Sequence, residues 1–127
     1  MNYGITKTID LSYEQAIEKV TEELKKEGFG VLTTIDVKDT LKKKLDVDFK
    51  KYIILGACNP PFAYEALLIE EQIGLLMPCN VIIYEKDNKT VISAFNPSTI
   101  AAVSGNNKLN ELSAKLNEKI YKVLENI

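Results

Sequence analysis

Five short stretches of the chain alternate apolar and polar residues or are continuously apolar, and this pattern predicts β-strands. They cover residues 3–9, 29–35, 51–58, 79–85 and 90–95. The third stretch is apolar on both faces, which indicates a central strand covered from both sides. Gly56 within it indicates a bulge or a close backbone contact, and Asp87-Asn88 predicts a tight hairpin turn between the last two strands. We expect the second strand to lie beside the first.

The first helix has the clearest sequence signals. Ser12 and Gln15 have the spacing of a capping box, in which each side chain bonds the backbone N–H of the other residue. Gly28 supplies the left-handed residue that commonly follows a helix C-terminus. We therefore predict an amphipathic helix between Ser12 and Gly28. Its apolar stripe consists of Ala16, Ile17, Val20 and Leu24.

Four further segments have helical spacing. Asp36 can cap a short helix, and Asn59 suits the N-cap of a helix that has Pro60 at its first position and ends at Gly74. The last two helices cover residues 98–103 and 108–125. The order of strands and helices, with a hairpin in the middle, predicts an α+β fold. We expect a mainly antiparallel sheet of about five strands packed against helices.

Composition narrows the possible functions. The 127 residues, of which 46% are hydrophobic, fit a single domain at 1–127. The net charge is −2 and all sixteen cations are Lys, so the chain lacks both a basic field and the Arg fork that binds nucleic acid. There is no His, which excludes Ser-His-Asp and Cys-His catalysis. Without a secretory leader or an apolar run of roughly 20 residues, we expect a cytoplasmic protein with no membrane or nucleic-acid partner.

Both cysteines lie at joints between predicted elements. Cys58, Asn59 and Pro60 connect the third strand to a helix, whereas Cys79 and Asn80 begin the fourth strand. If these strands pair antiparallel, the two joints lie side by side and can line one ligand site. The N–H groups of a helix N-terminus would favour an anion there. The alternative is that the cysteines are buried packing residues, Asn59 is a helix cap and Asn80 bonds the end of a turn.

The two thiols predict neither a disulfide nor a metal site. In a reducing compartment we expect both to be free. Two thiolates without His cannot supply the four ligands of a structural zinc site within one chain. We therefore expect no metal and no cofactor.

Several segments resemble a known family. They are Gly28-Phe29-Gly30-Val31-Leu32 with Asp36-Val37, then Asp48-Phe49, then Ile54-Leu55-Gly56-Ala57-Cys58-Asn59-Pro60 with Ala63 and Ala66-Leu67, and finally Gly74-Leu75-Leu76-Met77-Pro78-Cys79-Asn80-Val81. These motifs are similar to those of the family known as domain of unknown function 302. The resemblance implies an α+β domain like the TATA-binding-protein fold class, usually a homodimer, with no agreed activity and no DNA binding. Asn96 departs from the acidic residue that many relatives would have there, which puts in doubt any activity that needs that carboxylate.

A homodimer also needs an interface. Tyr64 and Leu68 lie four residues apart on a helix face that the predicted core stripe leaves unused, so we expect them in the interface. The outer face of the hairpin is the alternative surface.

Three functions fit these observations. The leading hypothesis is a homodimer that binds a small molecule, in one version an anion, at the Cys58-Asn59 and Cys79-Asn80 joints. The second is a thiol-dependent redox protein or enzyme, for which the chain offers neither a Cys-x-x-Cys pair nor a His base and no identified catalytic residue. The third is a purely structural or partner-binding dimer. Binding is therefore the stronger expectation than catalysis.

Overall fold

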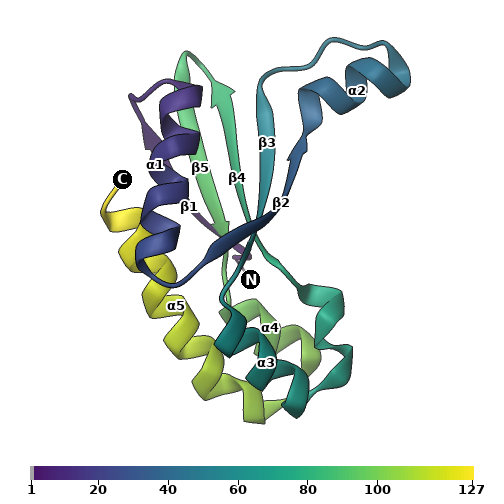
Figure 1. Cartoon of the computed structure of the whole chain (residues 1–127), viewed down its shortest axis with the longest axis vertical. Coiled ribbons are helices and arrows are strands. Elements are labelled where there is room, and N and C mark those ends of the chain that lie inside the picture. The colour runs from purple at the N-terminus through teal and green to yellow at the C-terminus, as the bar shows by residue number, and fades with distance from the viewer. Residues whose placement is uncertain (1) are drawn as a thin grey trace.

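The computed structural model describes residues 2–127 and shows a five-stranded antiparallel sheet with helices on one face and at one end (Figure 1). The strand order is β1-β5-β4-β3-β2. The predicted α+β class and its five antiparallel strands are confirmed. The strands are β1 (Gly4–Ile9), β2 (Gly30–Asp36), β3 (Tyr52–Cys58), β4 (Cys79–Lys86) and β5 (Lys89–Phe95).

The helices fall into three groups. α1 and α5 pack on one face of the sheet, α3 and α4 gather at one end, and α2 projects beyond the other end (Figure 1). The main core lies between the sheet and the pair α1 and α5. No helix within residues 2–127 combines the length and the apolar character needed to cross a membrane. The helices are α1 (Tyr13–Lys26), α2 (Val37–Leu45), α3 (Pro60–Ile69), α4 (Ser98–Ser104) and α5 (Asn110–Glu125), with the 3-10 helices η1 (Glu71–Leu76) and η2 (Asn107–Leu109).

Local signals determine both ends of α1, as predicted. The Ser12 hydroxyl accepts a hydrogen bond from the Gln15 N–H at 3.1 Å, and the Gln15 side chain accepts one from the Ser12 N–H at 3.2 Å. Gly28 has a φ of 83°, in the left-handed region that favours glycine. The Phe29 N–H then bonds the Leu24 carbonyl at 2.9 Å. This turn buries Phe29 and directs the chain into β2.

The place of β2 differs from the expectation. The neighbour of β1 is β5, and β2 lies at the opposite edge of the sheet beside β3. Between β1 and β2 the chain passes through α1, which contacts β5, β4 and β2 on its way across the sheet. Apolar periodicity identifies a strand but contains no information about its partner, so the sequence pattern could not place β2.

β3 is covered on one face only, which corrects the prediction of a strand covered from both sides. Ile53 and Leu55 are buried in the core, whereas Tyr52 and Ile54 on the other face are half-buried. There the Tyr52 ring stacks on Tyr84 of β4, with the ring centroids 5.2 Å apart. An apolar cluster on an open face therefore produces the same continuous pattern as a doubly covered strand.

Gly56 marks a close contact, as predicted. It faces Thr33 of β2, and a Cβ at this position would overlap Thr33 Oγ1 and lie 2.9 Å from Cγ of Pro78. The pairing of β2 with β3 shifts between Val31 and Thr33, so Leu32 is an extra residue in a bulge.

The helix predicted from Pro60 to Gly74 is interrupted. α3 ends at Ile69, and Glu70 has extended backbone angles of φ −147° and ψ 106° before η1 begins. Tertiary packing overrides the helical pattern here. The interruption places Ile73 in a second buried cluster, whose other members are Ala66, Ile100 and Leu109.

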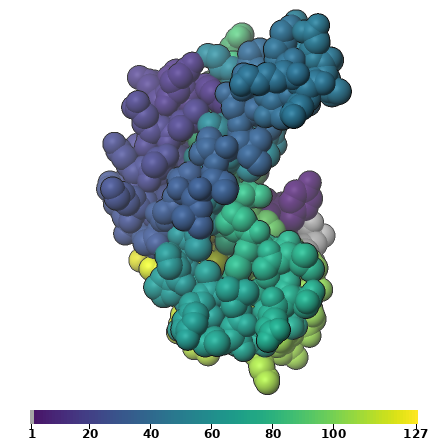
Figure 2. All heavy atoms as spheres, turned by 45° about the vertical axis from the view of Figure 1, so that its right-hand side comes forward, coloured from purple at the N-terminus to yellow at the C-terminus, as the bar shows by residue number. Residues whose placement is uncertain are grey.

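Residues 37–51 form an arm that stands out from the body of the molecule (Figures 1 and 2). The Asp36 carboxylate caps α2 by accepting a hydrogen bond from the Asp39 N–H at 3.0 Å, as predicted. No residue of α2 is buried, however, and the apolar side chains of Leu45, Val47 and Phe49 are exposed. The arm therefore presents three exposed apolar side chains at the surface of the monomer.

Candidate ligand pocket

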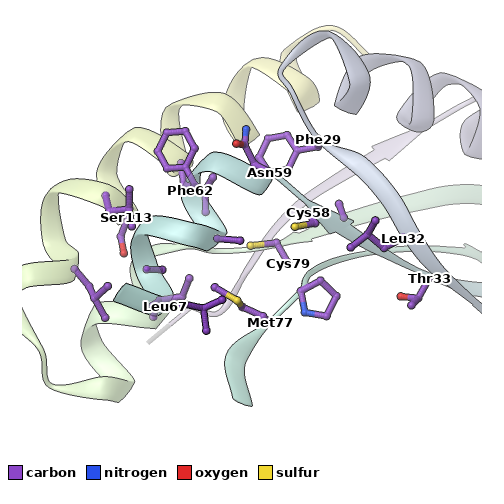
Figure 3. Close-up of a pocket in the computed structure, with 18 residues that line it drawn as sticks. Phe29, Leu32, Thr33, Cys58, Asn59, Phe62, Leu67, Met77, Cys79 and Ser113 are labelled. Atoms are coloured by element: carbon purple, nitrogen blue, oxygen red, sulfur yellow. The ribbon is translucent and has the colours of Figure 1, made fainter. Parts of the chain in front are cut away.

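A cavity of about 370 Å³ lies where the sheet meets α3 and α5. Its floor is formed by the end of β3 and the start of β4, its sides by α3 and α5, and one rim by the Leu32 bulge of β2 (Figure 3). Figure 2 shows its mouth as a hollow between β2 and α3, with atoms of α5 visible at the bottom. The lining is almost entirely apolar. It consists of Phe29, Leu32, Thr33, Ala57, Cys58, Asn59, Phe62, Ala63, Ala66, Leu67, Met77, Pro78, Cys79, Ile100, Leu109, Leu112, Ser113 and Leu116.

Three of the five predicted ligand-binding residues line this pocket. Cys58, Asn59 and Cys79 are brought together because β3 and β4 pair antiparallel, with Cys79 opposite the residue before Cys58. Pro60 and Asn80 do not line it; both are exposed, Pro60 at the start of α3 and Asn80 on β4. The two joints therefore lie side by side as predicted, although the cavity between them uses only part of each.

Asn59 does not cap α3 through its side chain, which corrects the expectation of a helix cap. It occupies the N-cap position but makes no side-chain capping bond. Pro60 and Pro61 follow it, and since proline has no N–H, two of the first helical N–H groups are missing. Asn59 Nδ2 instead donates a hydrogen bond to the Glu27 carbonyl at 3.2 Å, which holds the end of α1 against the start of α3.

The same two prolines weaken the case for an anion. An anion site at a helix N-terminus depends on free backbone N–H groups that point at the ligand. α3 offers fewer of these groups than an ordinary helix, and no Lys is among the residues that line the pocket. The anionic ligand expected from the sequence therefore finds no support in the geometry.

The two sulfur atoms face a pocket that favours neutral groups. Burial raises the pKa of the Cys79 thiol to about 11, and the nearby Cys58 adds to the shift. Cys79 is buried and Cys58 is partly accessible, and no disulfide joins them. Figure 3 shows both sulfurs, with that of Met77, directed into the same region of the cavity. Cys79 therefore presents a protonated thiol to a ligand at neutral pH.

Most of the remaining lining was missed at the level of sequence. Phe29, Leu112 and Leu116 have the pattern of core residues, and nothing in the chain shows that they border a cavity. One signal was available in α3, which contains a single charged residue, Glu65. A helix that is apolar around most of its circumference needs more than one apolar partner, and in α3 one of these surfaces is the pocket.

The other predicted or possible sites are different in character. The side chains of Tyr64 and Leu68 are 66% and 70% exposed on α3, and neither lines the pocket. A second hollow of about 360 Å³ on the arm is bordered mainly by charged residues, among which Lys42 pairs with Asp48 at 3.5 Å. Within residues 2–127 no group of three His, Cys, Asp or Glu side chains could hold a metal ion.

Asn96, the departure from the expected acidic residue, lies away from this pocket. Its Oδ1 accepts a hydrogen bond from the Ser98 N–H at 3.1 Å, and its Nδ2 donates one to the Asn2 carbonyl at 3.1 Å. The side chain therefore fixes the turn between β5 and α4 and does not border the cavity.

Comparison with known proteins agrees with this fold. The family described as "Domain of unknown function DUF302" matches residues 5–127. Among solved structures, the uncharacterized conserved protein DUF302 from Bacillus stearothermophilus is 28% identical, with a TM-score of 0.92 over 99% of this chain and 98% of that one. No curated protein matches the chain. The match over nearly the whole sequence shows that the chain belongs to the DUF302 family.

Proposed function

We propose that this chain is a cytoplasmic, homodimeric protein that binds a small apolar molecule in the pocket between the sheet end, α3 and α5. The observation that carries the proposal is the pocket itself: about 370 Å³ of space bordered by aliphatic, aromatic and sulfur-containing side chains. Small-molecule sites are typically concave, mostly apolar and equipped with a few polar groups. A protein of this size rarely contains an empty space of this volume, because the atoms around a void lose packing contacts.

Small side chains at the two joints support the proposal. Ala57, Cys58 and Cys79 are small enough to leave space above the floor, and Ala63 and Ala66 do the same along α3. Larger aliphatic residues at these five positions would fill the cavity. The small side chains therefore support binding over simple packing.

The thiol-based alternative has weaker support. A nucleophilic or redox-active cysteine needs a thiolate near neutral pH, which requires a lowered pKa. Burial has the opposite effect on Cys79. Slow alkylation of both thiols at neutral pH is the expected outcome, and rapid alkylation of Cys58 in the folded protein would favour the thiol enzyme.

A filled pocket provides the direct test of binding. Ala63, half-buried on α3, lines the cavity, so Ala63→Trp should occupy much of it. We expect the wild-type protein to bind the neutral dye N-phenyl-naphthylamine with enhanced fluorescence, and Ala63→Trp to weaken this binding at least about tenfold. Ala102→Trp is the matched control, because Ala102 is exposed on α4 and borders no part of the pocket. Equal dye binding by all three proteins would contradict the proposal.

A further inference from the structure

The lining of the pocket contains no charged residue. Neither a Lys nor an Asp or Glu side chain is among the eighteen residues that border it. A buried carboxylate or phosphate without a cation is strongly disfavoured, because it loses its hydration and gains no opposite charge. The two prolines at the start of α3 also remove backbone N–H groups that could replace a cation. The pocket therefore discriminates against anionic ligands.

Three residues with hydroxyl or amide side chains line this apolar space: Thr33 in β2, Asn59 and Ser113. The side chain of Asn59 is fixed by the bond from its Nδ2 to the Glu27 carbonyl, which leaves Oδ1 without a hydrogen-bond donor among the described residues. Figure 3 shows this amide between the rings of Phe29 and Phe62, with its oxygen on the Phe62 side. Asn59 is only 7% exposed, and it is among the residues that line the pocket.

Ser113 is the second such group. It is 5% exposed and borders the pocket. Figure 3 shows the hydroxyl projecting from α5 into the pocket. A ligand that fills the pocket displaces water from both side chains, so a ligand group that hydrogen-bonds them offsets that loss.

From these observations we propose that the ligand is an uncharged, mainly apolar molecule with a hydroxyl or similar hydrogen-bond donor. Asn59 Oδ1 accepts a hydrogen bond from this donor, and the Ser113 hydroxyl forms a second hydrogen bond with the same group. This inference rests on the proposed function and specifies the chemical class of its ligand. An acceptor of fixed orientation requires a donor on the ligand, because Nδ2 is already engaged with Glu27. The apolar remainder of the molecule lies along Leu109, Leu112 and Leu116.

Three ligands with the same alkyl chain differ only in the polar group at one end. Decanol has a hydroxyl donor, decyl methyl ether has only an acceptor, and decanoate is charged at neutral pH. Each is tested below its micelle concentration by displacement of N-phenyl-naphthylamine. We expect decanol to bind at least about tenfold more tightly than decanoate, and at least about threefold more tightly than the ether.

Variants connect this preference to the two side chains. Asn59→Leu should abolish the preference for decanol over the ether, and Ser113→Ala should reduce the affinity for decanol, whereas Ser104→Ala, outside the pocket, should change neither. If Asn59→Leu fails to fold, the ranking of the three ligands by the wild-type protein still decides the inference. Binding of decanoate or the ether as tight as that of decanol would overturn it and leave apolar binding intact. Failure of the dye itself to bind would overturn the proposed function as well.

Discussion

Asn59 connects three parts of the molecule. Its backbone links β3 to α3, its Nδ2 bonds the carbonyl that ends α1, and its side chain borders the pocket. The side chain also crowds Gly28, where an added Cβ would lie 3.1 Å from Nδ2. The sequence predicted Asn59 to line a ligand site or, as the alternative, to cap α3; it lines the pocket and occupies the N-cap position, but its side chain makes no capping bond.

A comparison of two substitutions distinguishes a cap from a tether. Aspartate is as good an N-cap as asparagine, but it cannot donate a hydrogen bond to the Glu27 carbonyl. We therefore expect Asn59→Asp to lower the free energy of unfolding by about 1–3 kcal/mol, as much as Asn59→Ala. Urea denaturation measures both. An Asn59→Asp protein as stable as wild type would show that the cap, and not the tether, matters.

Cys79 should make stability depend on pH in the alkaline range. The folded protein raises the pKa of this thiol from an ordinary value near 9.0 to about 11. Above pH 9 the unfolded chain loses this proton while the native state retains it, so the free energy of unfolding falls as pH rises toward 11. Below pH 9 the full contribution is present. Denaturation of wild type and Cys79→Ala from pH 7 to 11 should show a steeper loss in wild type, and parallel curves would contradict the shift.

Elements with local signals were predictable, whereas their partners were not. The capping box at Ser12 and the hairpin turn at Asp87-Asn88 each involve residues close in sequence. The structure contains both as expected, with Asp87 and Asn88 at positive φ. The edge position of β2 and the interruption at Glu70 depend on contacts with distant segments. The pocket belongs to the second kind, because β2, β3, β4, α3, α4 and α5 all contribute to its lining. Only its two cysteine joints could be predicted, from the expected antiparallel pairing.

The close packing of β2 on β3 gives a test at the level of these elements. A methyl group at Gly56 would collide with Thr33 and Pro78, so Gly56→Ala should force the strands apart and lower the free energy of unfolding by about 1–3 kcal/mol. Gly30→Ala is the matched control in β2, because no atom lies within 4 Å of an added Cβ there. Thermal denaturation should separate the two variants. Similar melting temperatures for both would show that the strands yield without strain.

Among residues 2–127, three groups of apolar side chains lie at least partly exposed on the surface. One is the α3 face with Tyr64 and Leu68, the second is the open face of the sheet with the Tyr52-Tyr84 stack, and the third is the arm. Separate exposed apolar residues are common, but continuous patches usually mark an interface. Their number supports the predicted homodimer, for which the sequence indicated the α3 face and, as the alternative, the outer face of the hairpin.

Charge substitutions can identify the surface that the dimer uses. We expect sedimentation at micromolar concentration to show a dimer, and Leu68→Asp to dissociate it, because a buried unpaired carboxylate is strongly unfavourable. Leu45→Asp on the arm is the matched comparison, since Leu45 is exposed to a similar degree. A wild-type monomer would end the prediction. Dissociation by Leu45→Asp alone would move the interface to the arm.

The bulge at Leu32 also affects how β2 can meet other proteins. An edge strand presents a row of free N–H and C=O groups, with which a strand of another chain can pair. The extra residue breaks the regular spacing of this row close to its start, between Val31 and Thr33. An incoming strand would lose its register at that point, since a bulge twists the edge and leaves backbone groups unmatched. The irregularity that forms one rim of the pocket thus also protects the protein from growing into fibres along this edge.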